Sequence, residues 1–236
     1  MVGLLLKSLT GYLLVAIVFI ILMPLCFIIA CLPAHVRFNS TLYYWCVYFL
    51  YLSAVKASFL TITKIYEGII PDEPSIIVAN HESALDIPFL GILLNGAPHT
   101  WLFLARYAKL PIFGFIARRM NIVVNLSSVH TMRNSLSQAL KRMHHTKSHL
   151  IVFPEGGRTV DKITKFYQGF AFLAKQSKRP VVPIKVFNLG NAYPPGSFLV
   201  HSYPIRIVIG EAFFYHEGER QEAFIERVRE WFINQQ

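Results

Sequence analysis

Apolar residues concentrate in the first 60 positions of the chain. The stretch from Gly11 to Leu32 carries no charged residue, and about 20 such residues suffice to cross the hydrocarbon core of a bilayer. This length predicts a membrane helix with a kink near Pro24. Lys7 precedes the stretch, so a cleaved signal peptide or lipoprotein leader is an alternative. The length and the lack of a clear small-x-small cleavage site favour a retained helix.

A second apolar stretch, Leu42 to Leu60, is dense in tyrosine. Tyr44, Tyr48 and Tyr51 recur at helical spacing, and such aromatic density is typical of the headgroup boundary. The segment can therefore span, re-enter or lie in the interface. We expect residues 1–63 to form a membrane-associated helical hairpin that anchors the chain.

Beyond Lys64 the pattern changes to short β-type runs separated by helical ones. Six runs predict strands, at 75–80, 100–105, 121–125, 149–153, 181–186 and 205–210. Three stripes of apolar residues predict helices, within 129–143, 166–174 and 224–232. The alternation predicts an α/β fold with a mixed, mostly parallel sheet flanked by helices, in one catalytic domain over 64–236.

Composition and charge narrow the class of partner. Hydrophobic residues make up 54% of the chain and charged residues only 15%, which indicates contact with a membrane. The formal net charge of +10 favours anionic partners such as phospholipid headgroups, coenzyme A or an acidic carrier protein. The basic residues are scattered and no nucleic-acid-binding motif is present, so we expect no nucleic acid partner.

The three cysteines, Cys26, Cys31 and Cys46, all lie in the apolar N-terminal part. Their odd number there indicates reduced thiols rather than a disulfide framework. The absence of cysteine beyond residue 63 excludes a cysteine nucleophile in the catalytic part. It also favours a catalytic domain on the cytoplasmic face of the membrane.

The segment 80–86 holds the first candidate catalytic residues, His81 and Asp86. It follows the apolar run SIIVA directly, and the chemistry of an α/β fold is expected at strand ends. An imidazole ordinarily titrates at about pH 6.5, so His81 can act as a general base at neutral pH. Asp86 can accept the other ring N–H. A loop histidine with a capping aspartate explains the spacing equally well.

The segment 153–159 again follows a predicted strand and combines two glycines with an arginine. Gly156 and Gly157 let backbone N–H groups approach an anion. Arg158 offers a planar fork of donors that matches phosphate oxygens. Glu155 can orient Arg158 or bond a substrate hydroxyl. Taken alone, the segment also fits a turn with a solvated ion pair.

Together the two segments resemble the glycerolipid acyltransferase family that includes 1-acyl-glycerol-3-phosphate acyltransferases. That family has Asn-His, four residues and Asp in its first block and Phe-Pro-Glu-Gly-x-Arg in its third, which 80–86 and 153–158 match. A fourth, proline-centred apolar block is matched at 181–184. The second block departs from the family. Its Pro-x-x-Gly is kept at 111–114, but its acceptor-binding Asp-Arg pair is replaced by Asn125-Leu126.

The resemblance implies direct transfer of a fatty acyl group without an acyl-enzyme. His81 would deprotonate the acceptor hydroxyl, and Asp86 would orient the imidazole. Substrate binding would fall to Glu155, Gly156, Gly157, Arg158 and Arg106. Arg106 stands near the family's usual lysine, and Lys109, Arg118 or Arg119 could likewise replace the missing arginine.

We therefore expect a membrane-bound acyltransferase of phospholipid biosynthesis with a lysophosphatidic acid-like acceptor. Acyl-CoA or an acyl carrier protein would be the donor, with no cofactor. A lyso-ornithine lipid, another lysophospholipid or glycerol 3-phosphate are alternative acceptors, and a catalytically silent lipid-binding protein is an alternative of another class. We expect no metal, because the second histidine that a zinc motif needs four residues after His81 is Leu85.

Overall fold

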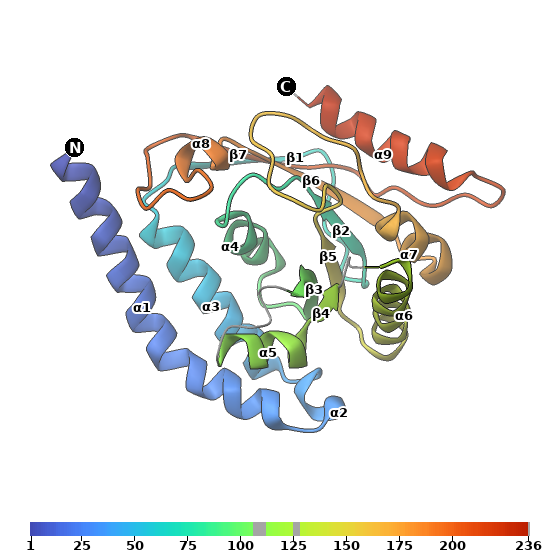
Figure 1. Ribbon diagram of the computed structural model, residues 1–236, viewed down its shortest axis with the longest axis horizontal. Coiled ribbons are helices and arrows are strands. Elements are labelled where there is room, and N and C mark those ends of the chain that lie inside the picture. The colour runs from blue at the N-terminus through green and yellow to red at the C-terminus, as the bar shows by residue number, and fades with distance from the viewer. Residues whose placement is uncertain (106–111, 125–127, 236) are drawn as a thin grey trace.

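The computed structural model describes residues 1–105, 112–124 and 128–235. A central sheet carries helices on both faces, and a helical hairpin lies along one side (Figure 1). The helices are α1 (Val2–Cys31), α2 (Ala34–Arg37), α3 (Thr41–Ala57), α4 (Asp86–Gly91), the 3-10 helix η1 (Ile92–Leu94), α5 (Phe113–Met120), α6 (Val129–His145), α7 (Gly169–Ser177), α8 (Leu189–Ala192) and α9 (Gln221–Asn234).

The sheet has seven strands in the order β1-β7-β6-β2-β5-β3-β4. The strands are β1 (Ile62–Tyr66), β2 (Ile76–Ala79), β3 (His99–Leu104), β4 (Ile122–Val124), β5 (His149–Val152), β6 (Val181–Phe187) and β7 (Ile205–Ile209). Only the β6–β7 pair is antiparallel among the pairings of the described strands. The predicted mixed, mostly parallel sheet is therefore confirmed.

The strand β1 was not predicted from the sequence. It pairs with β7 alone at the edge of the sheet, and most of its residues are exposed. An exposed edge strand does not need the apolar run that marks the buried strands, and Lys64 lies at its centre. The sheet thus begins at Ile62, slightly before the predicted start of the catalytic part.

Two apolar cores lie on opposite faces of the sheet. One core joins the strands to α3 and α4 through Val55, Phe89 and Leu90. The other joins them to α6, α7 and α9, and its buried helical residues include Ala139, Met143, Phe170, Leu173, Phe224, Val228 and Phe232. These residues belong to the three helical stripes that the sequence pattern predicted.

The strand β2 is buried at all four positions and lies between β5 and β6, parallel to both. The carboxyl ends of parallel neighbours meet at one edge of a sheet, so the segments that follow these three strands converge there. They include both candidate segments, 80–86 and 153–159. The topology alone thus brings the predicted site residues to one place.

The helix α1 is the one described helix long and apolar enough to cross a membrane. It begins at Val2, before the charge-free stretch, and runs through Pro24 without a break. Many apolar residues on its outer face are exposed, including Ile20 at 71% and Ile28 at 60%. The three cysteines of the hairpin are free thiols, as their odd number predicted.

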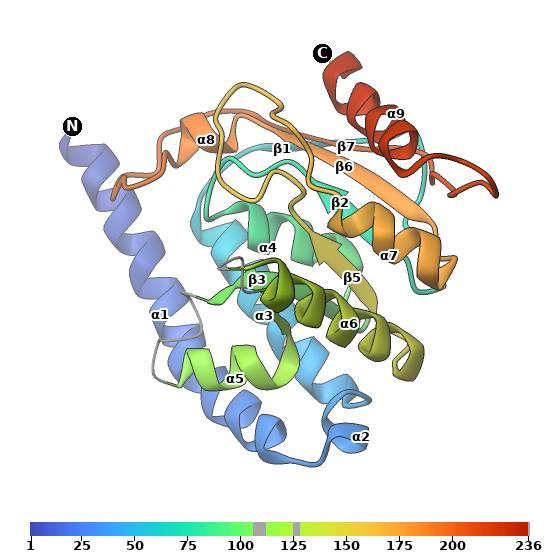
Figure 2. The same cartoon turned by 45° about the vertical axis from the view of Figure 1, so that its right-hand side comes forward.

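The inner face of α1 contacts the rest of the protein from end to end. Near its start, Ser8 Oγ accepts a hydrogen bond from Val200 N at 3.0 Å. Near its end, Ala30 O accepts one from Arg119 Nε at 2.9 Å. Residues 193–203, here called the strap, run beside the first half of α1 in both views (Figures 1 and 2). Both ends of α1 are therefore docked on the part of the chain that contains the sheet.

Gly11 marks the closest approach of α1 to α3, because a Cβ there would lie 2.4 Å from Ala57 O. We expect Gly11→Ala to push the helices apart and destabilise the protein by about 1–3 kcal/mol. Thermal unfolding in detergent would show a fall of several degrees, at about 2–4 °C per kcal/mol. Gly3→Ala is the matched control, because nothing lies within 4 Å of its added Cβ. Equal melting temperatures for the two variants would contradict this packing.

Candidate active site

The carboxylate of Asp86 organises the turn that follows β2. Its Oδ2 accepts hydrogen bonds from His81 Nδ1 at 2.7 Å, Glu82 N at 2.7 Å and Ser83 N at 2.8 Å. Asp86 is 1% exposed and the His81 side chain 13%. With its proton on Nδ1, the neutral imidazole keeps a lone pair on Nε2, which can accept a proton from a substrate. The pairing of His81 with Asp86 has the geometry that a general base requires.

The His81 ring lies flat against an aromatic wall. It stacks on Phe153, which directly follows β5, with ring centres 4.0 Å apart and an angle of 13° between the planes. Phe153 stacks in turn on Trp101 at 5.7 Å, and Trp101 Nε1 donates to Tyr51 Oη of α3 at 2.9 Å. The orientation of the imidazole is therefore fixed by two contacts, the hydrogen bond to Asp86 and the stacking on Phe153.

Glu155 joins the second candidate segment to the first. Its Oε1 accepts a hydrogen bond from His81 N at 3.2 Å, and its Oε2 accepts two from Thr164, from N at 3.0 Å and from Oγ1 at 2.9 Å. Thr159 N donates to His81 O at 2.7 Å. Arg158, the residue before Thr159, is exposed and makes no hydrogen bond or ion pair with the described residues. The expected contact between Glu155 and Arg158 is thus not formed, and Glu155 holds the loop instead.

The two glycines of this loop have different surroundings. Gly156 has a φ of +69°, and a Cβ there would lie 2.7 Å from the Tyr167 ring. A side chain is therefore excluded by backbone conformation and by space. Gly157 has nothing within 4 Å of an added Cβ. The space beside the Gly157 Cα is therefore open.

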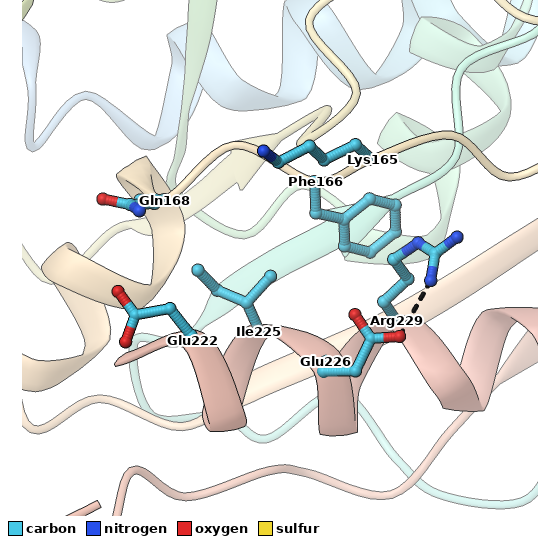
Figure 3. Close-up of a pocket in the computed structure, with 7 residues that line it drawn as sticks. All are labelled: Lys165, Phe166, Gln168, Glu222, Ile225, Glu226 and Arg229. Atoms are coloured by element: carbon cyan, nitrogen blue, oxygen red, sulfur yellow. Dashed lines mark hydrogen bonds and ion pairs between the residues drawn. The ribbon is translucent and has the colours of Figure 1, made fainter. Parts of the chain in front are cut away.

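A groove of about 390 Å³ lies behind this loop, between the segment 165–168 and α9. Figure 3 shows the Arg229 side chain among its lining residues, in an ion pair with Glu226 at 2.8 Å. Arg229 Nε also donates to Thr164 O at 3.0 Å, so α9 supports the threonine that binds Glu155. His81 does not line this groove, and the groove is therefore separate from the candidate site.

Two residues of the segment 80–86 that were not assigned to catalysis or binding shape the turn. Asn80 bonds both backbone groups of Val186, with Oδ1 accepting from N and Nδ2 donating to O, each at 2.8 Å. Ser83 is fully buried and donates from Oγ to Tyr193 O in the strap at 2.8 Å. Their partners lie more than 100 residues away. Asn80 stands in the first motif, which was the only available signal.

Of the four cationic candidates of the second family block, Arg118 and Arg119 lie among the described residues, both in α5. Arg106 and Lys109, like Asn125 and Leu126, lie outside the described residues. Arg119 turns away from the sheet edge and donates to Ala30 O at the end of α1. Within the described ranges, no three histidine, cysteine or acidic side chains gather so as to hold a metal ion.

Comparison with known proteins gives one family. A family model described as Acyltransferase matches residues 61–186. The 1-acyl-sn-glycerol-3-phosphate acyltransferase of Pseudomonas aeruginosa is 27% identical over 202 residues, which are 85% of this chain and 77% of that one. A lyso-ornithine lipid O-acyltransferase of the same organism is 32% identical over 102 residues, 43% of this chain and 38% of that one.

The fold also matches a solved structure. The crystal structure of the 1-acyl-sn-glycerophosphate (LPA) acyltransferase PlsC from Thermotoga maritima superposes with a TM-score of 0.77. The match covers 98% of this chain and 95% of that chain, at 21% sequence identity. At this identity the likeness shows a shared fold.

Glu82 carries an unusual charge state beside Asp86. Burial raises the pKa of Glu82 to about 7, and repulsion from Asp86 and Asp161 acts in the same direction. Hydrogen bonds from Gly190 N and Asn80 Nδ2, each 3.2 Å long, oppose the rise only in part. Near neutral pH the Glu82 carboxyl group is therefore protonated in about half of the molecules.

This difference predicts a pH-dependent stability. The folded protein holds the Glu82 proton more tightly than the unfolded chain, whose value is near 4.5. The stabilisation is fully present below about pH 4.5 and is lost as the pH rises through about 7. We expect the melting temperature of wild type minus that of Glu82→Gln to fall across this window. A difference independent of pH would show that Glu82 is not perturbed.

Proposed function

Since the chain belongs to the acyltransferase family, we propose that it transfers a fatty acyl group from a thioester to the free hydroxyl of a lysophosphatidic acid-like acceptor. Membership of this family makes it an enzyme, and its relatives are glycerolipid acyltransferases. One observation carries the finer proposal. Asp86 binds Nδ1 of His81 and leaves Nε2 available, and the backbone of His81 accepts a hydrogen bond from Thr159, the residue after the exposed Arg158.

In the proposed reaction His81 Nε2 takes the proton from the acceptor hydroxyl as the oxygen attacks the thioester carbonyl. The tetrahedral intermediate collapses by breaking the C–S bond, and the imidazolium returns its proton to the leaving thiolate. Asp86 stabilises the imidazolium through Nδ1 while the proton is held. The products are the acylated lipid and the free thiol of coenzyme A or a carrier protein, so no further cofactor is needed.

The acceptor phosphate is assigned to the loop that carries Arg158. A guanidinium fork matches two phosphate oxygens, and the guanidinium of Arg158 has no partner among the described residues. The open backbone at Gly157 lets the phosphate approach closely. Glu155 supports this site by holding the loop against His81 rather than by touching the substrate.

The hairpin is assigned to the membrane, with the catalytic domain on the cytoplasmic face. A helix that crossed the bilayer would separate its ends by about 30 Å of hydrocarbon. Both ends of α1, however, are hydrogen-bonded to segments of the catalytic domain that carry polar groups. These groups are the backbone N–H of Val200 and the side chain of Arg119. Such segments cannot lie in hydrocarbon. We therefore assign α1 to a position along the membrane surface, with its exposed apolar face in one leaflet.

A lyso-ornithine lipid is the second candidate acceptor. Leu126 stands where the family has the arginine that helps hold the acceptor phosphate, and one relative is named for acylation of a lyso-ornithine lipid. An acceptor without phosphate would not need that arginine. Turnover of each lipid with one labelled thioester separates the candidates, and activity confined to lysophosphatidic acid would remove the second.

We expect His81→Ala to lower kcat by about 100- to 10,000-fold, because it removes the general base. The KM values should change little, since the imidazole binds neither substrate strongly. Steady-state kinetics on the purified, folded variant give both constants. His130→Ala, an exposed histidine of α6, is the control and should keep full activity. Retention of full acyl transfer by His81→Ala would defeat the mechanism.

Arg158→Ala tests the phosphate assignment separately. Loss of a charge-assisted hydrogen bond is worth about 1.5–3 kcal/mol, so the acceptor KM should rise by about 10- to 100-fold. The donor KM should stay constant. Lys162→Gln removes a charge from the same exposed loop and should have a much smaller effect. A change confined to the donor KM would instead indicate that Arg158 binds the phosphate groups of the acyl donor.

A further inference from the structure

Three arginine side chains gather where the hairpin turns back, at the C-terminal ends of α1 and α5. Arg37 Nε donates to Arg119 O at 3.2 Å. The guanidinium carbons of Arg37 and Arg142 lie 4.5 and 3.6 Å from the centre of the same ring, that of Phe38. Segments from α2, α5 and α6 thus bring three cations to one corner, here called the tip cluster (Arg37, Arg119 and Arg142).

The tip cluster has no acidic partner among the described residues. The sequence contains no aspartate or glutamate in residues 1–66 or 87–154, and the ion pairs of the described residues lie elsewhere. Burial is the main cause that lowers the pKa of Arg142 to about 10; Tyr44 opposes the fall and the Arg37 charge adds to it. Burial and the Arg119 charge likewise lower the pKa of Arg37. The cations of the cluster therefore repel one another without a counter-charge.

Backbone carbonyls satisfy only part of the cluster. Arg37 Nη1 donates to Leu32 O at 2.9 Å, Arg119 donates to Ala30 O and Leu32 O, and Arg142 Nη1 donates to Met120 O at 3.1 Å. The end of a helix attracts a cation, which explains why each arginine lies here. It does not explain three cations with no anion. Each guanidinium has five N–H donors, so further donors remain for a ligand.

Exposed apolar residues occur on the neighbouring turns of α1, α2 and α3. Ile28, Val36 and Leu42 are 60%, 41% and 54% exposed. Arginine beside an exposed apolar surface is the arrangement found at the depth of lipid headgroups. The cluster also lies far from the catalytic turn. Tyr12, which contacts the strap near Ser83, and Ala30 are separated by roughly 27 Å along α1 at 1.5 Å per residue.

We propose that the tip cluster binds the phosphate group of an anionic phospholipid in the membrane, at a site separate from the acceptor site at Arg158. The proposal rests on the proposed membrane contact of the hairpin. Planar guanidinium forks match phosphate oxygens, and the neighbouring apolar residues match the acyl chains. A bound lipid would supply the missing negative charge and fix the far end of the hairpin at the membrane.

Flotation of the full-length protein with vesicles tests the site. The vesicles contain phosphatidylcholine alone or with phosphatidylglycerol. We expect wild type to bind both and to prefer the anionic vesicles. Arg37→Gln should lower the partition coefficient for anionic vesicles by about fivefold, because one basic residue is worth about 1 kcal/mol there. Binding to neutral vesicles and kcat with micellar substrate should stay constant. Arg220→Gln, at the start of α9, is the charge-matched control.

Arg37→Lys distinguishes a site that depends on the guanidinium geometry from a general attraction between positive charge and anionic lipid. It keeps the charge but loses the fork and the bonds to Leu32 O and Arg119 O, so we expect it to weaken anionic binding as well. Melting curves confirm that each variant is folded. Wild-type binding by Arg37→Lys, or an equal loss for Arg220→Gln, would overturn the proposal. If inorganic phosphate at millimolar concentration abolished the preference for anionic vesicles, the ligand of the cluster would be free phosphate and not a lipid. Failure of wild type to bind either vesicle would instead contradict the membrane role of the hairpin.

Discussion

The site depends on one oxygen atom, Asp86 Oδ2, which takes three hydrogen bonds within a single turn. A buried carboxylate is costly unless it is bonded, and here its donors are the imidazole and the two backbone N–H groups beside it. The turn can close around the carboxylate only if β2 ends at Ala79 and α4 begins at Asp86. The position of His81 is therefore tied to the hydrogen bonding of Asp86 Oδ2, whereas the buried Oδ1 has no hydrogen-bond partner among the described residues.

The N-terminal hairpin of α1 and α3 is connected to this turn by hydrogen bonds and ring contacts. Ser83, which donates to Asp86, is bonded to Tyr193 in the strap, and the Tyr193 hydroxyl is bonded to Tyr12 of α1 at 3.2 Å. From the other helix of the hairpin, Tyr51 reaches the His81 ring through the stacked aromatic wall. Both helices of the hairpin thus support the turn that carries His81 and Asp86.

The sequence predicted local features well and distant contacts poorly. The buried strands and the motif residues His81 and Asp86 carry patterns that are readable within a few positions. By contrast, Glu155 was expected to orient its neighbour Arg158 or to bond a substrate hydroxyl, and in the structure its carboxylate joins His81 N to Thr164. Such pairings depend on which strand ends meet, and no local pattern records that. The edge strand β1 was missed because an exposed strand needs no apolar run.

The central claim is that Asp86 fixes the imidazole of His81 with its proton on Nδ1 and its lone pair on Nε2. Nitrogen-15 NMR of histidine-labelled protein measures this directly, with His81→Ala used to assign the signal. At a pH where the imidazole is neutral, the account predicts a protonated Nδ1 and an unprotonated Nε2 for His81, with the Nδ1 proton shifted downfield by the carboxylate. A proton on Nε2, or an even mixture of the two tautomers, would contradict it.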